Sequence, residues 1–170
     1  MKVAFFDRDG TIIEDYPDAK WTFIDNPSFL EGAVETLKTV ISKGYRVIII
    51  TNQYLINEEF ITLNQYNDIT NKMLHILHNH GIEILDIFYC PHSKKEECRC
   101  FKPKTGMIDQ ALKKYAAINM AESFMIGDSL VDVELAANAK IKGFGIGVEK
   151  TSEDEKIYQL TSIKDLPQHI

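Results

Sequence analysis

The chain has 170 residues, of which 45% are apolar and 26% charged. This length and composition are typical of one compact domain with a hydrophobic core, and they exclude disordered and fibrous proteins. A formal net charge of −6 at pH 7 argues against a general nucleic-acid binder, which needs a basic surface. No apolar run approaches bilayer length, and Asp7 interrupts any signal sequence, so we expect a cytoplasmic protein with no membrane partner.

Short apolar runs alternate with segments of helical periodicity along the chain. The runs predict buried strands over residues 3–6, 45–50, 84–89, 124–126 and 142–148. The periodic segments predict helices over 28–44, 62–81, 107–115 and 130–139, with a terminal helix in the last twenty residues. Capping boxes are expected at Ser28 and Glu31 for the first helix, and at Thr62 and Gln65 for the second.

This alternation implies βαβ units and a mainly parallel sheet with helices on both faces. We therefore predict an α/β fold, a three-layer α/β/α domain of Rossmann-like topology that spans 1–170. A large cap domain is not expected, because neither the segment after Asp9 nor the one after Thr51 has room for it. In such sheets the ligand site lies at the carboxyl ends of the strands.

The predicted strand ends carry three carboxylates that suit phosphoryl transfer. Asp7, at the end of the first strand, can attack phosphorus and form an aspartyl phosphate. Asp9 can protonate the leaving oxygen and later activate water. Asp128 follows the fourth strand, and carboxylates that face a phosphate require a hard divalent cation, for which Mg²⁺ is suited.

The other strand ends supply groups that can hold the phosphoryl oxygens: the Thr51 hydroxyl, the backbone amides after Asn52 and the Lys102 ammonium. Lys104 competes with Lys102 for this role, and Asp132 is open between a helix-capping and a functional role. Together these groups predict a magnesium-dependent phosphatase that acts on a small soluble phosphate ester.

All three cysteines lie in one short stretch that also holds a histidine. Cys90, His92, Cys98 and Cys100 offer the number and kind of ligands that structural zinc takes. With all four positions filled by protein, the ion has no open site for water. We therefore predict a structural Zn²⁺ in the loop 90–100, which braces the chain that delivers Lys102.

The pattern of DxDGT at residues 7–11, then Thr51, Lys102 and Gly127-Asp128, resembles the haloacid dehalogenase superfamily over nearly the whole chain. The resemblance implies that Asp7 is the nucleophile, that Asp9 is the general acid and base, and that Asp7, the Asp9 carbonyl and Asp128 hold Mg²⁺. The CxH and CxC pairs of the zinc loop narrow it to the branch of histidinol phosphatases and D-glycero-D-manno-heptose 1,7-bisphosphate phosphatases.

The chain departs from the heptose enzymes at the residue before the lysine, where Phe101 stands in place of their usual arginine. Loss of that guanidinium removes a phosphate clamp, so a monophosphate and a bisphosphate both stay open. Trp21, Phe23 and Tyr54 are candidates for the substrate mouth or for packing.

A heptose or related sugar phosphate is our first expectation for the substrate. The alternatives are histidinol phosphate, a polynucleotide end, or a zinc-braced binding protein without turnover. We favour a monomer.

Overall fold

A computed structural model describes residues 1–149 and 155–170 of the chain. Its centre is a six-stranded sheet of order β3-β2-β1-β4-β5-β6, in which every neighbouring pair is parallel. The strands are β1 Val3–Phe6, β2 Arg46–Asn52, β3 Ile84–Cys90, β4 Phe124–Gly127, β5 Lys142–Ile146 and β6 Ile157–Leu160. The chain winds outward from β1 to β3 and then returns to β4 on the other side of β1, so the strand order reverses at β1.

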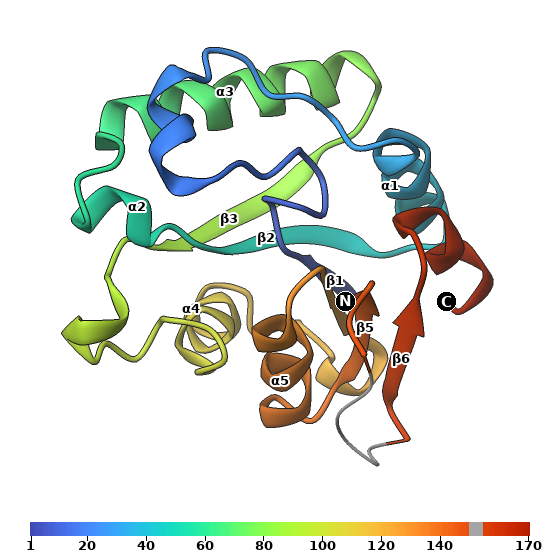
Figure 1. Ribbon diagram of the computed structural model, residues 1–170. Coiled ribbons are helices and arrows are strands. Elements are labelled where there is room, and N and C mark those ends of the chain that lie inside the picture. The colour runs from blue at the N-terminus through green and yellow to red at the C-terminus, as the bar shows by residue number, and fades with distance from the viewer. Residues whose placement is uncertain (150–154) are drawn as a thin grey trace.

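Helices cover both faces of this sheet, which confirms the predicted three-layer arrangement (Figure 1). They are α1 Ala33–Ser42, α2 Tyr54–Asn57, α3 Leu63–Asn79, α4 Gly106–Lys114 and α5 Leu130–Asn138. Successive side chains of a strand point to opposite faces. Phe6 accordingly packs in one core with α1 and α3, and Phe5 in the other with α4 and α5.

The segments where a cap domain would be inserted are short, as expected. After β1 the chain forms a single 3₁₀ helix, Asp18–Phe23, and after β2 it forms α2, which has four residues. Within residues 1–149 and 155–170 there is therefore no large cap over the carboxyl edge. Among these residues, too, none of the helices combines the length and the hydrophobicity needed to cross a lipid bilayer.

Of the two predicted capping boxes, only the second forms. Thr62 and Gln65 bond reciprocally at the start of α3. The box at Ser28 and Glu31 is wrong, since α1 begins after Gly32 with no side-chain cap. Ser28 precedes Phe29, which forms an isolated β-bridge with Ile13, and the Ser28 carbonyl accepts from Glu14 N. The Glu31 carboxylate pairs with Lys164 instead.

The predicted terminal helix is also wrong. Residues 151–154 lie outside the described part of the chain, but Ile157–Leu160 forms the edge strand β6, followed by a 3₁₀ helix, Ile163–Gln168. Only Ile157 and Leu160 of this strand are buried. Four residues whose two middle positions, Tyr158 and Gln159, are both exposed carry too little alternation to indicate a strand.

Candidate active site

The carboxyl ends of the strands border a cavity of about 240 Å³. It lies where the strand order reverses, which is the expected place for a ligand in an open α/β sheet. The six residues that the sequence assigned to phosphate chemistry all line this cavity: Asp7, Asp9, Thr51, Asn52, Lys102 and Asp128. The structure thus brings together groups from four separate stretches of the chain.

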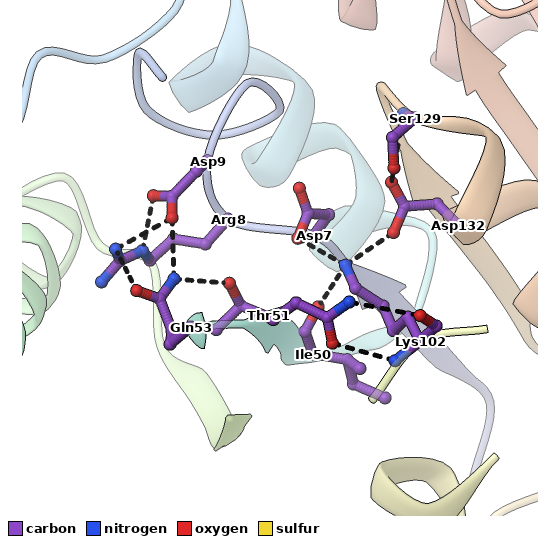
Figure 2. Close-up of polar contacts among 10 residues, drawn as sticks. Asp7, Arg8, Asp9, Ile50, Thr51, Gln53, Lys102, Ser129 and Asp132 are labelled. Carbon is purple, nitrogen blue, oxygen red and sulfur yellow. Dashed lines mark hydrogen bonds and ion pairs between the residues drawn. The ribbon is translucent and has the colours of Figure 1, made fainter. Parts of the chain in front are cut away.

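Lys102 is buried, and its ammonium lies at the centre of a cluster of oxygen atoms (Figure 2). Its Nζ is 2.6 Å from Asp7 Oδ1, 2.6 Å from Asp132 Oδ1 and 3.2 Å from the Ile50 carbonyl. Burial by itself would lower the pKa of Lys102, but the two carboxylates outweigh it and raise that pKa, so the ammonium is charged. Lys104 instead donates to the Cys98 carbonyl on the surface, so Lys102 alone of the two enters the cavity.

Asp132 has both of the roles between which the sequence could not decide. Its Oδ2 accepts from the backbone N–H and the hydroxyl of Ser129, which makes the capping box of α5. Its Oδ1 accepts from Lys102 Nζ. The signal that could have found this role is its position one turn after Asp128, on the helix that leaves the same strand end.

Three carboxylates form a group that could hold a cation. Ligand oxygens of Asp7, Asp128 and Asp132 all lie within 4.8 Å of one another. Burial raises the pKa of Asp7 well above its usual range against the pull of Lys102, with Asp132 and Asp9 adding to the rise. Burial and Asp132 likewise raise the pKa of Asp128 to about 6. A divalent cation would offset this crowding, and the hard oxygen donors fit Mg²⁺.

Gly10 makes the close approach of Asp128 to the first loop feasible. It has a φ of +81°, and a Cβ at this position would collide with the Asp128 carboxylate. Glycine is thus the residue that permits both the turn after Asp9 and the placing of Asp128 against it.

Asp9 lines the cavity, but its carboxylate is turned toward Arg8 and Gln53, as Figure 2 shows. Asp9 Oδ1 accepts from Arg8 Nε at 2.7 Å, and Oδ2 accepts from Arg8 Nη2 at 3.0 Å and from Gln53 Nε2 at 2.7 Å. Gln53 Nε2 also lies 2.8 Å from the buried Thr51 hydroxyl. Arg8 and Gln53 were missed by sequence reasoning, because neither residue type indicates burial by itself.

Asn52 contacts the lysine segment of the site with its side chain. The side chain hydrogen-bonds twice to the main chain of Lys102. The N–H of Gln53 already donates to the Cys90 carbonyl at 2.7 Å, so it is not free to bind a phosphate. Among the amides after Asn52, the Gln53 N–H is therefore not part of the predicted phosphate site.

The predicted zinc ligands converge in the loop that follows β3. Ligand atoms of Cys90, His92, Cys98 and Cys100 all lie within 4.8 Å of one another. The Cys90 and Cys100 sulfurs are 3.0 Å apart, and His92 Nδ1 is 3.2 Å from Cys100 Sγ. Three sulfurs and one imidazole nitrogen gathered around one point fit a tetrahedral Zn²⁺. Cys100 stands two residues before Lys102, so the loop leads straight to the cavity.

The lining of the cavity also holds the carboxylates of Asp15 and Asp18, several aromatic rings and the cationic Lys94. Asp15 accepts from Trp21 Nε1 at 3.1 Å, and Asp18 accepts from the Tyr54 hydroxyl at 2.8 Å. The ring centres of Tyr54 and Phe101, which both line the cavity, lie 6.5 Å apart. Burial, together with the charge of Asp9, raises the pKa of Asp15.

Of the three aromatic residues that the sequence left open, Trp21 and Tyr54 line the cavity. Phe23 is 78% exposed and is not part of the lining.

Comparison with known proteins gives a consistent set of relatives. The family described as polynucleotide kinase 3 phosphatase matches residues 2–146. D-glycero-beta-D-manno-heptose-1,7-bisphosphate 7-phosphatase of Haemophilus influenzae is 36% identical over 98% of this chain and 95% of its own length. The histidine biosynthesis bifunctional protein HisB of Campylobacter jejuni subsp. doylei is 34% identical over 91% of this chain, which spans 44% of that protein.

Among solved structures, D,D-heptose 1.7-bisphosphate phosphatase from B. bronchiseptica, complexed with magnesium and phosphate, superposes with a TM-score of 0.86. The match covers 99% of this chain and 97% of that one at 23% sequence identity, so it supports the fold.

Proposed function

The chain belongs to the haloacid dehalogenase superfamily, in the branch of heptose bisphosphate phosphatases and histidinol phosphatases, and is a phosphoric monoester hydrolase; we propose that it acts on a small sugar phosphate. D-glycero-D-manno-heptose 1,7-bisphosphate is the first candidate, since relatives of nearly the same length carry that name. The observation that carries the proposal is the placing of Asp7, Lys102 and Asp128 around one cavity at the point where the strand order reverses.

In this proposal Asp7 is the nucleophile. A carboxylate oxygen of Asp7 bonds to phosphorus while the bond from phosphorus to the ester oxygen breaks. The electron pair of that bond stays on the leaving oxygen, which takes a proton from Asp9. Water then loses a proton to Asp9 and attacks phosphorus, so that inorganic phosphate leaves and the Asp7 carboxylate is restored.

The remaining groups hold the phosphate and orient the nucleophile. Lys102 neutralises charge on the transferring oxygens while its contact with Asp132 fixes the ammonium. The Thr51 hydroxyl stands at the end of β2 beside them. Asp7, Asp128 and the Asp9 carbonyl would hold Mg²⁺, which screens the carboxylates from the incoming phosphate. Zn²⁺ in the loop 90–100 has a structural role, because four protein ligands leave no open position.

Histidinol phosphate is the second candidate, and two carboxylates of the cavity lining support it. Asp15 and Asp18 line the cavity beside one further cation, Lys94, while Phe101 stands where an arginine would clamp a second phosphate. Carboxylates repel a second phosphate and attract a cationic group. HisB proteins of Campylobacter jejuni match this chain at 34% to 35% identity, which supports the same candidate.

The test is phosphate release in Mg²⁺ from a panel of esters. The panel holds heptose 1,7-bisphosphates of both anomers, histidinol phosphate, common sugar phosphates and a 3′-phosphorylated oligonucleotide. We expect one heptose bisphosphate to be hydrolysed far faster than the rest. Preference for histidinol phosphate would support the second candidate, and preference for the oligonucleotide would contradict both. The Asp7→Asn protein, purified identically, controls for contaminating phosphatases.

A further inference from the structure

Arg8 is a charged side chain buried beneath the active-site cavity. It is 1% exposed, and its guanidinium carbon lies 5.0 Å from the ring centre of Tyr66 and 5.7 Å from that of Trp21. A buried guanidinium is costly unless its N–H groups have partners and its charge is offset. The arrangement around Arg8 supplies both.

Four hydrogen bonds fix the guanidinium. Nε and Nη2 donate to the two carboxylate oxygens of Asp9, Nη1 donates to Thr70 Oγ1 at 2.9 Å, and Nη2 also reaches Gln53 Oε1 at 3.3 Å. Thr70 is on α3 and Gln53 follows β2, so Arg8 connects Asp9 to two separate elements. A two-point contact of this kind sets the plane of a carboxylate as well as its position.

Asp9 has little freedom as a result. Its Oδ2 also accepts from Gln53, whose amide nitrogen in turn contacts Thr51. An aspartate in a solvated loop samples several rotamers, whereas this one is tied to the strand end that borders the phosphate site. Only 14% of its side chain is exposed. Arg8 itself does not line the cavity, so any effect it has on the reaction passes through the residues it contacts, and Asp9 takes two of its four hydrogen bonds.

We propose that Arg8 is a positioning residue for Asp9, and that it holds the carboxyl group where it exchanges a proton with the leaving oxygen. The inference rests on the proposed phosphatase function. Proton transfer depends on heavy-atom geometry, so loss of the Arg8 contacts to Asp9 lowers the rate of the step in which the leaving oxygen needs a proton.

The test compares two esters that differ in their need for an acid. An alkyl phosphate such as a sugar phosphate has a leaving oxygen that needs a proton, whereas the nitrophenolate of p-nitrophenyl phosphate leaves without one. The ratio kcat/KM reports the steps up to the aspartyl phosphate. With Arg8→Met we expect kcat/KM to fall about 100-fold for the alkyl ester and less than about 5-fold for p-nitrophenyl phosphate. Asp9→Asn should show the same selectivity for the leaving group.

A gentler variant separates positioning from folding. Thr70→Val keeps the shape of a side chain whose hydroxyl bonds to Arg8 and to Tyr66 and makes no direct contact with Asp9. We expect a selective loss of about 3-fold to 10-fold on the alkyl ester alone, because one contact to Arg8 is removed. Thr36→Val is the matched control, since Thr36 is also buried and bonds to the Ile163 carbonyl, away from the cavity. This control should leave kcat/KM unchanged for both esters.

If wild-type protein is active and kcat/KM falls equally for the two esters in Arg8→Met and Thr70→Val, the inference about Arg8 is overturned while the proposed function stands. A wild-type protein that hydrolyses neither ester in Mg²⁺ would overturn the proposed function and the inference with it.

Discussion

Asn52 holds the main chain of Lys102 with both ends of its side-chain amide. Asn52 Oδ1 accepts from Lys102 N at 2.9 Å, and Asn52 Nδ2 donates to the Lys102 carbonyl at 3.3 Å. The end of β2 is thereby tied to the segment that leaves the zinc loop. Lys102 is thus fixed twice, at its backbone by Asn52 and at its ammonium by Asp7 and Asp132.

Replacing Asn52 should therefore lower turnover through Lys102. In Asn52→Ala both hydrogen bonds are lost, at about 1 kcal/mol each, and we expect kcat to fall about 10-fold to 100-fold. Steady-state kinetics measures this. Asn138→Ala is the control. Asn138 donates to the carbonyl of Pro103, the residue that follows Lys102, at an exposed site. Similar losses in the two variants would contradict a specific tether at Lys102.

Asp7→Asn should abolish turnover without loss of stability. Without the proposed nucleophile the enzyme should lose at least about 1,000-fold in kcat. The pKa of Asp7 is raised on folding, so its ionised form costs stability at any pH above its ordinary pKa. A neutral amide removes that cost, and the metal-free variant should melt no lower than wild type at pH 7.

Calorimetry and phosphate release test this pair of outcomes together. Near-normal turnover would exclude Asp7 as the nucleophile. Normal folding with no turnover would support its proposed role.

Zinc removal should act on both stability and rate. We expect one zinc ion per chain by elemental analysis, and loss of it in Cys98→Ser. Since the loop leads directly to Lys102, the melting temperature and kcat should fall together, both in Cys98→Ser and in wild type treated with a chelator. Added Zn²⁺ should restore both properties in the chelated wild type but not in Cys98→Ser. His80→Ala removes an exposed histidine outside the cluster and serves as the control. Unchanged melting in Cys98→Ser would exclude a structural metal.

The sequence was sufficient to predict six residues of the cavity lining because parallel topology carries the information. Once β1, β2 and β4 are recognised, Asp7, Thr51 and Asp128 must end on one edge of the sheet. The position of Lys102 could be predicted as well, because the cysteine spacing indicates where the loop returns to this edge of the sheet. The gathering of Cys90, His92, Cys98 and Cys100, the predicted zinc ligands, depends on that same short spacing.

Contacts that depend on the tertiary structure were not predictable in this way. Arg8 stands in the first motif, but its burial follows from the rings of Tyr66 and Trp21, which are distant in sequence. The direction of the Asn52 side chain is likewise set by a partner fifty residues away. The edge strand β6 was missed because its pairing with β5 is non-local and its own pattern is weak.

Gly127 offers a way to move Asp132 without altering its chemistry. A Cβ at this position would collide with the Asp132 carboxylate. In Gly127→Ala the Asp132 side chain must shift, which disturbs its contact with Lys102, and we expect kcat to fall about 10-fold or more. Gly81→Ala is the contrast: its φ of +75° is strained for alanine, yet nothing lies within 4 Å of the added Cβ.

We therefore expect Gly81→Ala to lower stability by about 1 kcal/mol and to leave kcat unchanged. Denaturant unfolding and kinetics on both variants distinguish the two effects. Equal kcat values for Gly127→Ala and wild type would show that Asp132 does not orient Lys102.

Phe101→Arg should change which substrates are preferred, because it places a guanidinium in the lining of the cavity. The comparison is between a heptose 1,7-bisphosphate and the corresponding 7-phosphate, which differ only in the second phosphate. A new charge-assisted contact should raise kcat/KM for the bisphosphate relative to the monophosphate by about 10-fold. Phe101→Leu removes the ring without adding charge, so it should leave that ratio as in wild type. If both variants shift the ratio equally, the shape of the lining and not its charge sets the preference. If neither variant shifts it, the second phosphate does not reach residue 101.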